Sequence, residues 1–201
     1  MDHGHDGKPL LAARTCAVVL AAGAGSRFHG PTHKLLAVID GRPVYQWALA
    51  AALGAGLEHV IVVTGAAPLE LPSTVIAAHN EHWADGQATS LQCGLRAAAA
   101  LDADAVVVGL GDQPFITAGS WTALAAAMTP IAIATYGGKR GNPVRLHRSI
   151  WPLLPTAGDH GARSLIAQQP DLVGEVACHG SPADIDTMED LRQWNSSTNS
   201  S

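Results

Sequence analysis

The sequence predicts an α/β fold in three layers, in which a mostly parallel sheet is covered by helices on both faces. Three observations carry this prediction. Apolar, β-branched runs of strand length alternate with segments of helical periodicity along the 201 residues. The runs lack an alternation of polar and apolar residues, so their strands must be buried on both faces, as in a parallel sheet. Hydrophobic residues make up 47% of the chain and charged residues 14%, which supplies a packed core and excludes a disordered polypeptide.

The first half of the chain alternates strands and helices. Residues 15–21 (TCAVVLA) form a β-branched run that ends in glycines, which predicts a buried strand. Residues 43–56 place apolar side chains at helical spacing and begin with a proline, a residue suited to the first turn of a helix. The next predicted elements are strand 59–64, strand 74–78, helix 87–101 and strand 105–110.

The second half contains more turns. Helix 118–128 and strand 130–136 continue the alternation, and the following GGKRGNP segment predicts a loop-rich insertion. Short helical pieces are expected at 148–154 and 162–169, a late strand at 172–176 and a terminal helix at 187–194. No repeat or linker divides the chain. We therefore expect one domain over residues 14–195, between a flexible N-terminal tail (1–13) and a disordered C-terminal tail (196–201).

Charge and cysteine content exclude several classes of partner. The 12 Lys and Arg residues against 17 Asp and Glu residues give a net charge of −5, which argues against binding to nucleic acid or anionic lipid. No apolar segment approaches the ~20 residues of a membrane span. The N-terminus lacks the basic-then-apolar order of a signal peptide. Three widely spaced cysteines suit free thiols in a reducing compartment, so we expect a cytoplasmic protein.

A glycine-rich segment follows the first predicted strand. Residues 20–27 read LAAGAGSR, and Lys34 comes shortly after them. Glycines let backbone N–H groups approach an anion closely, and Arg27 and Lys34 add positive charge. The segment therefore predicts a phosphate-binding turn, the alternative being an ordinary strand–helix turn. Lys34 lacks the Gly-Lys-Ser/Thr context of a Walker A loop, and Phe28 stands where a dinucleotide fingerprint needs its third glycine, which argues against a dinucleotide-binding reductase.

Carboxylates occur at two later positions. Asp112 follows a buried strand in GDQP, where it suits a hard cation such as Mg²⁺ or, alternatively, a turn or helix cap. Asp184 and Asp186 would share one face if their segment is extended, and the residues from Thr187 to Asp190 read equally as a capping box. A basic glycine turn combined with carboxylates that hold a divalent cation is what nucleoside triphosphate chemistry requires.

The motifs, taken in order, are similar to those of one enzyme family. LAAGAGSR followed by a lysine, then GDQP, GNP, GDHGAR and DIDTMEDL, resemble the MobA-like nucleotidyltransferases, most closely their molybdenum cofactor cytidylyltransferase branch. The likeness covers residues from about 15 to 195 and implies a Rossmann-like fold of the nucleotide-diphospho-sugar transferase type. The chain departs from the family pattern at Phe28-His29-Gly30, where the family has Met-Gly, and at Met188, where it has proline.

The resemblance also implies roles for individual residues. Arg27, Lys34 and Asp112 would be catalytic, and Asp112 and Asp186 would hold Mg²⁺. The residues expected to bind the nucleotide are Leu20, Ala21, Ala22, Gly23, Ala24, Gly25, Ser26, Asn80, Gln87 and Ser90. The residues expected to bind the acceptor are Asn142, Pro143, Asp159 and Arg163.

The implied reaction is a Mg²⁺-dependent transfer of CMP from CTP to the phosphate of molybdopterin, with release of pyrophosphate. A molybdenum hydroxylase would receive the product. Ala22 favours CTP, because the guanylyltransferases more often have glycine at that position. The alternatives are the use of GTP or of another phosphorylated acceptor, and a non-catalytic carrier of the molybdenum cofactor. Paired metal carboxylates argue against a pure carrier, which has no use for them.

Overall fold

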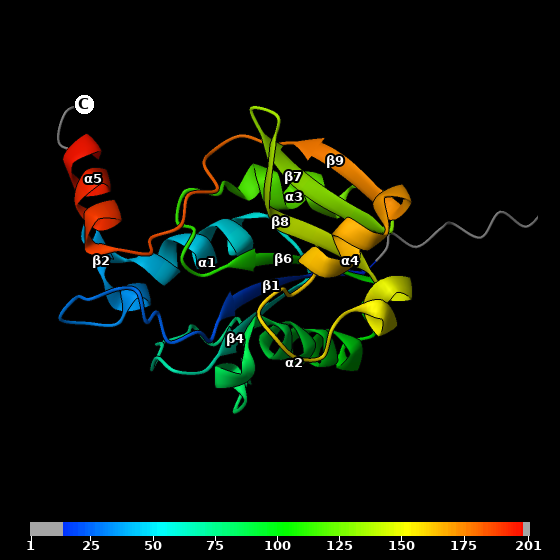
Figure 1. Ribbon diagram of the computed structural model, residues 1–201, viewed down its shortest axis with the longest axis horizontal. Helices are drawn as coiled ribbons and strands as arrows, with labels where there is room; N and C mark the ends of the chain where they lie inside the picture. Colours follow the sequence, from blue (N-terminus) through cyan, green and yellow to red (C-terminus); the bar gives the residue numbers. More distant parts are fainter. Residues whose placement is uncertain (1–13, 199–201) are drawn as a thin grey trace, which may run out of the picture.

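The computed structural model describes residues 14–198, whose strands form a seven-stranded sheet and a separate two-stranded one (Figure 1). The large sheet has the order β5-β4-β1-β6-β8-β7-β9, and β2 pairs with β3 in the small one. The strands are β1 (Thr15–Ala21), β2 (Val38–Ile39), β3 (Arg42–Pro43), β4 (His59–Thr64), β5 (Ile76–His79), β6 (Ala105–Leu110), β7 (Ile131–Tyr136), β8 (Lys139–His147) and β9 (Val173–Ala177).

Five α-helices and four short 3-10 helices accompany these strands in residues 14–198. The α-helices are α1 (Val44–Gly54), α2 (Gln87–Ala100), α3 (Ala118–Ala125), α4 (Arg163–Gln168) and α5 (Met188–Thr198). The 3-10 helices are η1 (Lys34–Leu36), η2 (Trp83–Asp85), η3 (Arg148–Leu153) and η4 (Pro170–Leu172). No helix in residues 14–198 is long and apolar enough to cross a membrane.

Most strand pairings in the large sheet are parallel, as predicted. β1 runs parallel to β4 and β6, β4 to β5, and β7 to β9. Because the carboxyl ends of parallel strands meet at one edge of a sheet, the segments that follow β1 and β6 come together there. This edge carries the site described below.

The two faces of the sheet bury separate apolar clusters, which gives the three predicted layers. Alternate residues of β1 serve the two faces: Val18 belongs to the cluster that includes residues of α2 and α4, whereas Val19 belongs to the one that includes residues of α1 and α3. The side chains of β1 are all buried, as expected for a strand covered on both sides.

The prediction of a loop-rich segment after residue 137 is wrong, because β8 forms there and runs antiparallel to both of its neighbours, β6 and β7. The register with β7 shifts between Ile133 and Ala134, whose partners are Val144 and Gly141, so Asn142 and Pro143 lie in a bulge. A bulge tolerates proline, which has no N–H to donate to a neighbouring strand. The proline and glycine signals therefore belong to a bulged strand.

Element boundaries differ from the predictions by a few residues at most. α3 ends three residues before its predicted end at 128, and β5 begins two residues after its predicted start at 74. α5 extends to Thr198, within the predicted C-terminal tail. Each residue added to an existing helix gains one backbone hydrogen bond, so a helix is easily extended once it has formed. The predicted tail 1–13 and residues 199–201 lie outside the described residues.

Candidate active site

A cavity of about 510 Å³ opens at the carboxyl ends of β1 and β6, and we call it the glycine-turn cavity. Its walls come from five segments that are distant in the sequence. The predicted residues that line it are Leu20, Ala21, Ala22, Gly23, Ala24, Gly25, Ser26, Arg27, Lys34, Gln87, Ser90, Asp112, Asp159, Arg163 and Asp186. The phosphate-binding turn and both predicted metal carboxylates therefore face one space.

The glycine turn is shaped around the stem of Lys34. Gly25 has a φ of +63°, a conformation that side-chain-bearing residues rarely adopt, and its carbonyl accepts a hydrogen bond from the N–H of Phe28 at 2.9 Å. A Cβ atom at Gly25 would lie only 2.8 Å from Cγ of Lys34. The glycine thus lets the lysine side chain lie directly against the turn.

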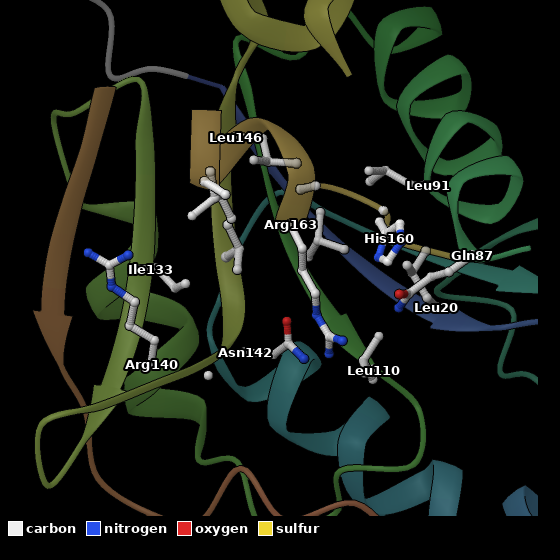
Figure 2. Close-up of a pocket in the computed structure, with 17 residues that line it drawn as sticks. Leu20, Gln87, Leu91, Leu110, Ile133, Arg140, Asn142, Leu146, His160 and Arg163 are labelled. Atoms are coloured by element: carbon white, nitrogen blue, oxygen red, sulfur yellow. The ribbon is translucent and has the colours of Figure 1, made fainter. Parts of the chain in front are cut away.

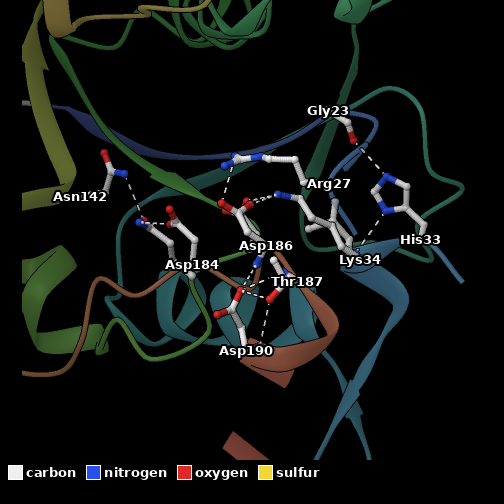
Figure 3. Close-up of polar contacts among 12 residues, drawn as sticks. Gly23, Arg27, His33, Lys34, Asn142, Asp184, Asp186, Thr187 and Asp190 are labelled. Carbon is white, nitrogen blue, oxygen red and sulfur yellow. Dashed lines mark hydrogen bonds and ion pairs between the residues drawn. The ribbon is translucent and has the colours of Figure 1, made fainter. Parts of the chain in front are cut away.

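His33 ties η1 to the glycine turn, a role that the sequence analysis did not predict. Its Nδ1 accepts a hydrogen bond from the N–H of Leu35 at 3.2 Å, so Nε2 carries the proton and donates it to the carbonyl of Gly23 at 3.0 Å (Figure 3). Burial, followed by the positive charge of Lys34, lowers the pKa of His33, although the bond to Gly23 opposes this. The neutral ring therefore links the lysine segment to the turn.

Lys34 lies between the two aspartates at the centre of the site. Its Nζ is 2.5 Å from Oδ2 of Asp112 and 3.0 Å from Oδ1 of Asp186. Nη2 of Arg27 is 3.0 Å from the other oxygen of Asp186. Figure 3 shows Arg27 and Lys34 converging on the Asp186 carboxylate. Residues from three distant segments thus form one network of charges.

Burial differs within this network. The side chains of Lys34, Asp112 and Asp186 are 13%, 15% and 21% exposed, whereas that of Arg27 is 75% exposed. Burial alone would lower the pKa of Lys34, but the Asp112 carboxylate, with help from Asp186, raises it above the ordinary value. Lys34 is therefore held as a cation, and Arg27 is the cation that reaches into solvent.

The donor set fits a divalent cation only in part. In the described part of the chain, no three His, Cys, Asp or Glu side chains are grouped so that they alone could hold a metal ion. Asp112 and Asp186 nevertheless place an oxygen within 3.0 Å of the same nitrogen atom. Hard cations such as Mg²⁺ commonly take one or two carboxylates and complete their shell with substrate phosphates and water. The pair fits such a shared site.

A chain of amide contacts runs from the carboxylates to β8. Nε2 of Gln113 donates to Oδ1 of Asp184 at 2.6 Å, and Nδ2 of Asn142 donates to Oε1 of Gln113 at 3.1 Å (Figure 3). Burial, followed by the nearby charge of Asp112, raises the pKa of Asp184. Gln113 is itself buried, so this chain fixes the position of Asn142 relative to Asp184.

A second cavity, of about 400 Å³, adjoins the first, and we call it the apolar cavity. Leucine, isoleucine and valine side chains make up much of its wall, and Leu20, Gln87, Leu110 and Arg163 line both cavities. Figure 2 shows the side chain of Arg163 pointing from α4 toward Asn142 and Leu110. A cationic side chain therefore stands where the two cavities meet.

Two of the predicted site residues line neither cavity. Asn80 is buried, and its side chain donates to Oγ1 of Thr89 and Oγ of Ser90 and accepts from the N–H of His82. These hydrogen bonds hold Asn80 against the first turn of α2. Pro143 is also buried, within the bulge of β8. Asn142 faces the apolar cavity, and Asp159 faces the glycine-turn cavity.

Three residues of the site were missed by sequence reasoning. Gln113 lies within the GDQP motif, where the neighbouring carboxylate of Asp112 is the stronger chemical signal. His33 directly precedes the basic residue of the turn, and a polar side chain at the start of a short helix is a capping signal. Trp83 lines the glycine-turn cavity, and an aromatic residue four positions before a helix start gives no signal of that location.

Comparison with known proteins finds one matching family model and several relatives. The model of the MobA-like NTP transferase domain family matches residues 17–173. The chain is 30% identical over 190 residues to the purine catabolism protein PucB of Bacillus subtilis, which covers 86% of this chain and 92% of PucB.

Other relatives share part of their length or their fold with this chain. It is 36% identical over 108 residues to the bifunctional protein GlmU of Cutibacterium acnes, which covers 50% of this chain and 25% of GlmU. The chain thus spans about a quarter of this relative. The crystal structure of Rv0371c from Mycobacterium tuberculosis H37Rv matches with a TM-score of 0.76 and 28% identity, over 92% of this chain and 100% of the other. A structure of Rv0371c in complex with manganese matches with a TM-score of 0.73 and 27% identity, over 92% and 99% of the two chains.

Proposed function

Because this chain belongs to the MobA-like NTP transferase family of nucleotidyltransferases, we propose that it transfers CMP from CTP to the phosphate of molybdopterin and releases pyrophosphate. One observation carries this proposal. The glycine turn, two cations and two carboxylates face a single cavity, and a second, apolar cavity adjoins it across Arg163. A site of this form has room for a triphosphate and for an acceptor that carries its own phosphate.

The chain's own residues would position the triphosphate and balance its charge. The backbone of the glycine turn and the side chains of Arg27 and Lys34 bind the phosphates. Asp112 and Asp186 would hold Mg²⁺, which would spread the charge that builds on the α-phosphorus and the departing pyrophosphate. The structure of the related Rv0371c in complex with manganese supports the use of a divalent cation by this chain.

The acceptor supplies its own nucleophile in the proposed reaction. An oxygen of the acceptor phosphate forms a bond to the α-phosphorus of CTP, and the bond between that phosphorus and the bridging oxygen of pyrophosphate breaks. No side chain needs to attack, because the acceptor oxygen is already an anion. Arg163, which faces both cavities, is placed to bring the acceptor phosphate toward the α-phosphorus by charge attraction.

The lining of the apolar cavity supports a flat heterocyclic acceptor over a sugar or polyol phosphate. Hydroxyl groups buried against leucine, valine and isoleucine side chains would lose their hydrogen bonds to water. A fused ring system instead buries its faces on the apolar wall and directs its polar edge to a few fixed groups. Gln87, Asn142 and His160 are such groups in the wall of this cavity.

The choice of CTP rests on the resemblance of Ala22 to the cytidylyltransferase branch. Gln87 and Ser90, at the start of α2, line the same cavity and offer amide and hydroxyl contacts to a pyrimidine ring. We further propose that residues 14–195 act as one catalytic domain in the cytoplasm. A molybdenum hydroxylase would receive the product.

The decisive experiment measures pyrophosphate release with each nucleoside triphosphate, in the presence of Mg²⁺ and of molybdopterin or a panel of other phosphorylated acceptors. CTP with molybdopterin should give the highest rate, and Asp112→Ala should lower it by about 100-fold or more. Asp171→Ala, at an exposed position in η4, is the matched control and should retain full activity.

Three outcomes would contradict the proposal. Full turnover by Asp112→Ala would reject the role of the central carboxylate. A preference for GTP or for a sugar phosphate would reject the assigned substrates. Tight binding of molybdopterin without turnover of any nucleotide would favour a carrier.

A further inference from the structure

A third apolar cluster is separate from the two clusters that cover the faces of the sheet, and some of its members are adjacent in sequence to charged residues of the site. We call it the satellite cluster. Its buried members are Phe28, Ala37, Ile39, Val44 and Ile185, with Phe115, Met188, Leu191 and Trp194 packed against them. These residues come from the segment after β1, the β2–β3 region, the start of α1, the segment after β6, the segment before α5, and α5 itself. Figure 1 shows α5 beside β2 at one end of the molecule, away from the large sheet.

Members of the satellite cluster are immediate neighbours in sequence of the site's charged residues. Ile185 is fully buried in the cluster, and the carboxylates on either side of it, Asp184 and Asp186, line the glycine-turn cavity. Phe28 is buried in the same cluster, and Arg27, directly before it, lines that cavity. In each case the apolar side chain is anchored on one side of the backbone and the charged one projects to the other.

Phe28 and Met188 also approach each other across Gly30. A Cβ atom at Gly30 would collide with the ring of Phe28 and would lie 2.9 Å from Sδ of Met188. The arginine segment and the first turn of α5 therefore meet at one contact.

Hydrogen bonds fix the segment of Asp186 in the same place. The N–H of Ile185 donates to the carbonyl of Asp112 at 2.9 Å. Oδ2 of Asp190, in the first turn of α5, accepts from the N–H groups of Asp186 and Thr187 at 3.1 and 2.8 Å. The start of α5 thus sets the backbone position of Asp186. The ion pair between Asp186 and Arg27 contributes little ordering by itself, because the arginine side chain is largely exposed to solvent.

We propose that Phe28 and Met188 are positioning residues: by packing α5 against the arginine segment, they hold Arg27 and Asp186 together at the triphosphate end of the cavity. This inference rests on the proposed binding of a metal–triphosphate, but not on CTP or molybdopterin as the substrates. Loosening the packing would leave the charges present and their spacing undefined.

The test measures binding of inorganic tripolyphosphate in the presence of Mn²⁺ by isothermal titration calorimetry, which does not depend on the nucleotide or the acceptor. Phe28→Ala should weaken binding about tenfold or more, and Phe28→Leu should restore most of the affinity. Met188→Ala should weaken binding in the same direction. Leu124→Ala, a truncation in a fully buried position of α3, is the matched control and should lose thermal stability with binding unchanged.

A double-mutant comparison separates positioning from general destabilisation. Arg27→Met should weaken tripolyphosphate binding about tenfold in the wild-type protein and less than about twofold in Phe28→Ala, because the arginine is no longer held in place there. An equal effect of Arg27→Met in both backgrounds would overturn the inference. So would wild-type binding by Phe28→Ala, or equal weakening by Leu124→Ala. If tripolyphosphate binds as expected but CTP is not turned over, the proposed function fails while the positioning role stands.

Discussion

Replacing Lys34 with methionine should allow the site to bind a divalent cation in the absence of nucleotide. In the present arrangement the Lys34 ammonium is hydrogen-bonded to both carboxylates that would hold the metal. At an effective dielectric constant of 20, two unit charges 4 Å apart interact with about 4 kcal/mol, so a divalent ion would be repelled by about 8 kcal/mol. Lys34 avoids this repulsion only by leaving the aspartates.

The cost of that departure sets the expected size of the effect. Hydrogen bonds to charged groups contribute about 1.5–3 kcal/mol each, and Lys34 would give up two of them. The two bonds together contribute about 3–6 kcal/mol, and a free-energy cost at the lower end, about 3 kcal/mol, corresponds to a change in affinity of about 100-fold or more. We therefore expect Lys34→Met to bind Mn²⁺ about 100-fold more tightly than the wild-type protein when no nucleotide is present.

The assay is a titration of free Mn²⁺ by electron paramagnetic resonance, with and without CTP. Addition of CTP should tighten Mn²⁺ binding by the wild-type protein, because the triphosphate brings negative charge and offers Lys34 new partners. Lys139→Met, at an exposed position at the start of β8, is the control for loss of a positive charge and should behave like the wild type. Equal Mn²⁺ affinity of Lys34→Met and the wild type would refute the reasoning.

Three further changes test individual parts of the site. Slight burial alone would raise the pKa of Asp190, but hydrogen bonds at the start of α5 lower it, so its stabilising effect is present above pH ~4 and is lost as the pH falls through the lowered value. Asp190→Ala should therefore lower the free energy of unfolding in urea by about 1 kcal/mol at pH 7 and by much less at pH 3; an equal loss at both would contradict this. Burial lowers the pKa of His33, so NMR titration should place it below about 6.5, and the stability advantage of the wild type over His33→Phe should shrink, not grow, between pH 7.5 and 5.5. Gly25→Ala should lose about 1–2 kcal/mol of unfolding free energy and weaken tripolyphosphate binding, because it strains a positive φ and displaces Lys34. Gly56→Ala, which has a similar φ but open space around it, should lose stability without weakening binding, and weakened binding there would argue against a role for the turn.

The parts of the fold that follow a strict hydrophobic pattern could be predicted from the sequence. β1, β4 and β6 have the bounds expected for continuous apolar runs, because strands buried on both faces admit few polar residues. β8 could not be predicted in this way. Its first half carries charged and turn-forming residues, and a bulge accommodates Pro143, so the local signals of a loop and of this strand are the same.

The location of the candidate site could be predicted for similar reasons, but not its internal contacts. Asp112 was expected at the end of a strand, and strand ends meet at one edge of a parallel sheet. That Lys34 would lie between Asp112 and Asp186 depends on the path of the chain between β1 and η1, where no repeating pattern fixes the backbone. The same is true of Asn80, whose buried position depends on how the segment before α2 folds against the start of that helix.

The turn between β7 and β8 has a consequence for the order in which the chain acquires its shape. Only Gly137 and Gly138 join the paired residues Tyr136 and Lys139, and both glycines have a positive φ, as a tight hairpin of this kind requires. Contacts between nearby residues form without closing a long loop, whereas each parallel pairing waits for a crossover. We therefore expect this hairpin to form early and to offer β6 and β9 a ready-made edge on which the rest of the sheet can assemble.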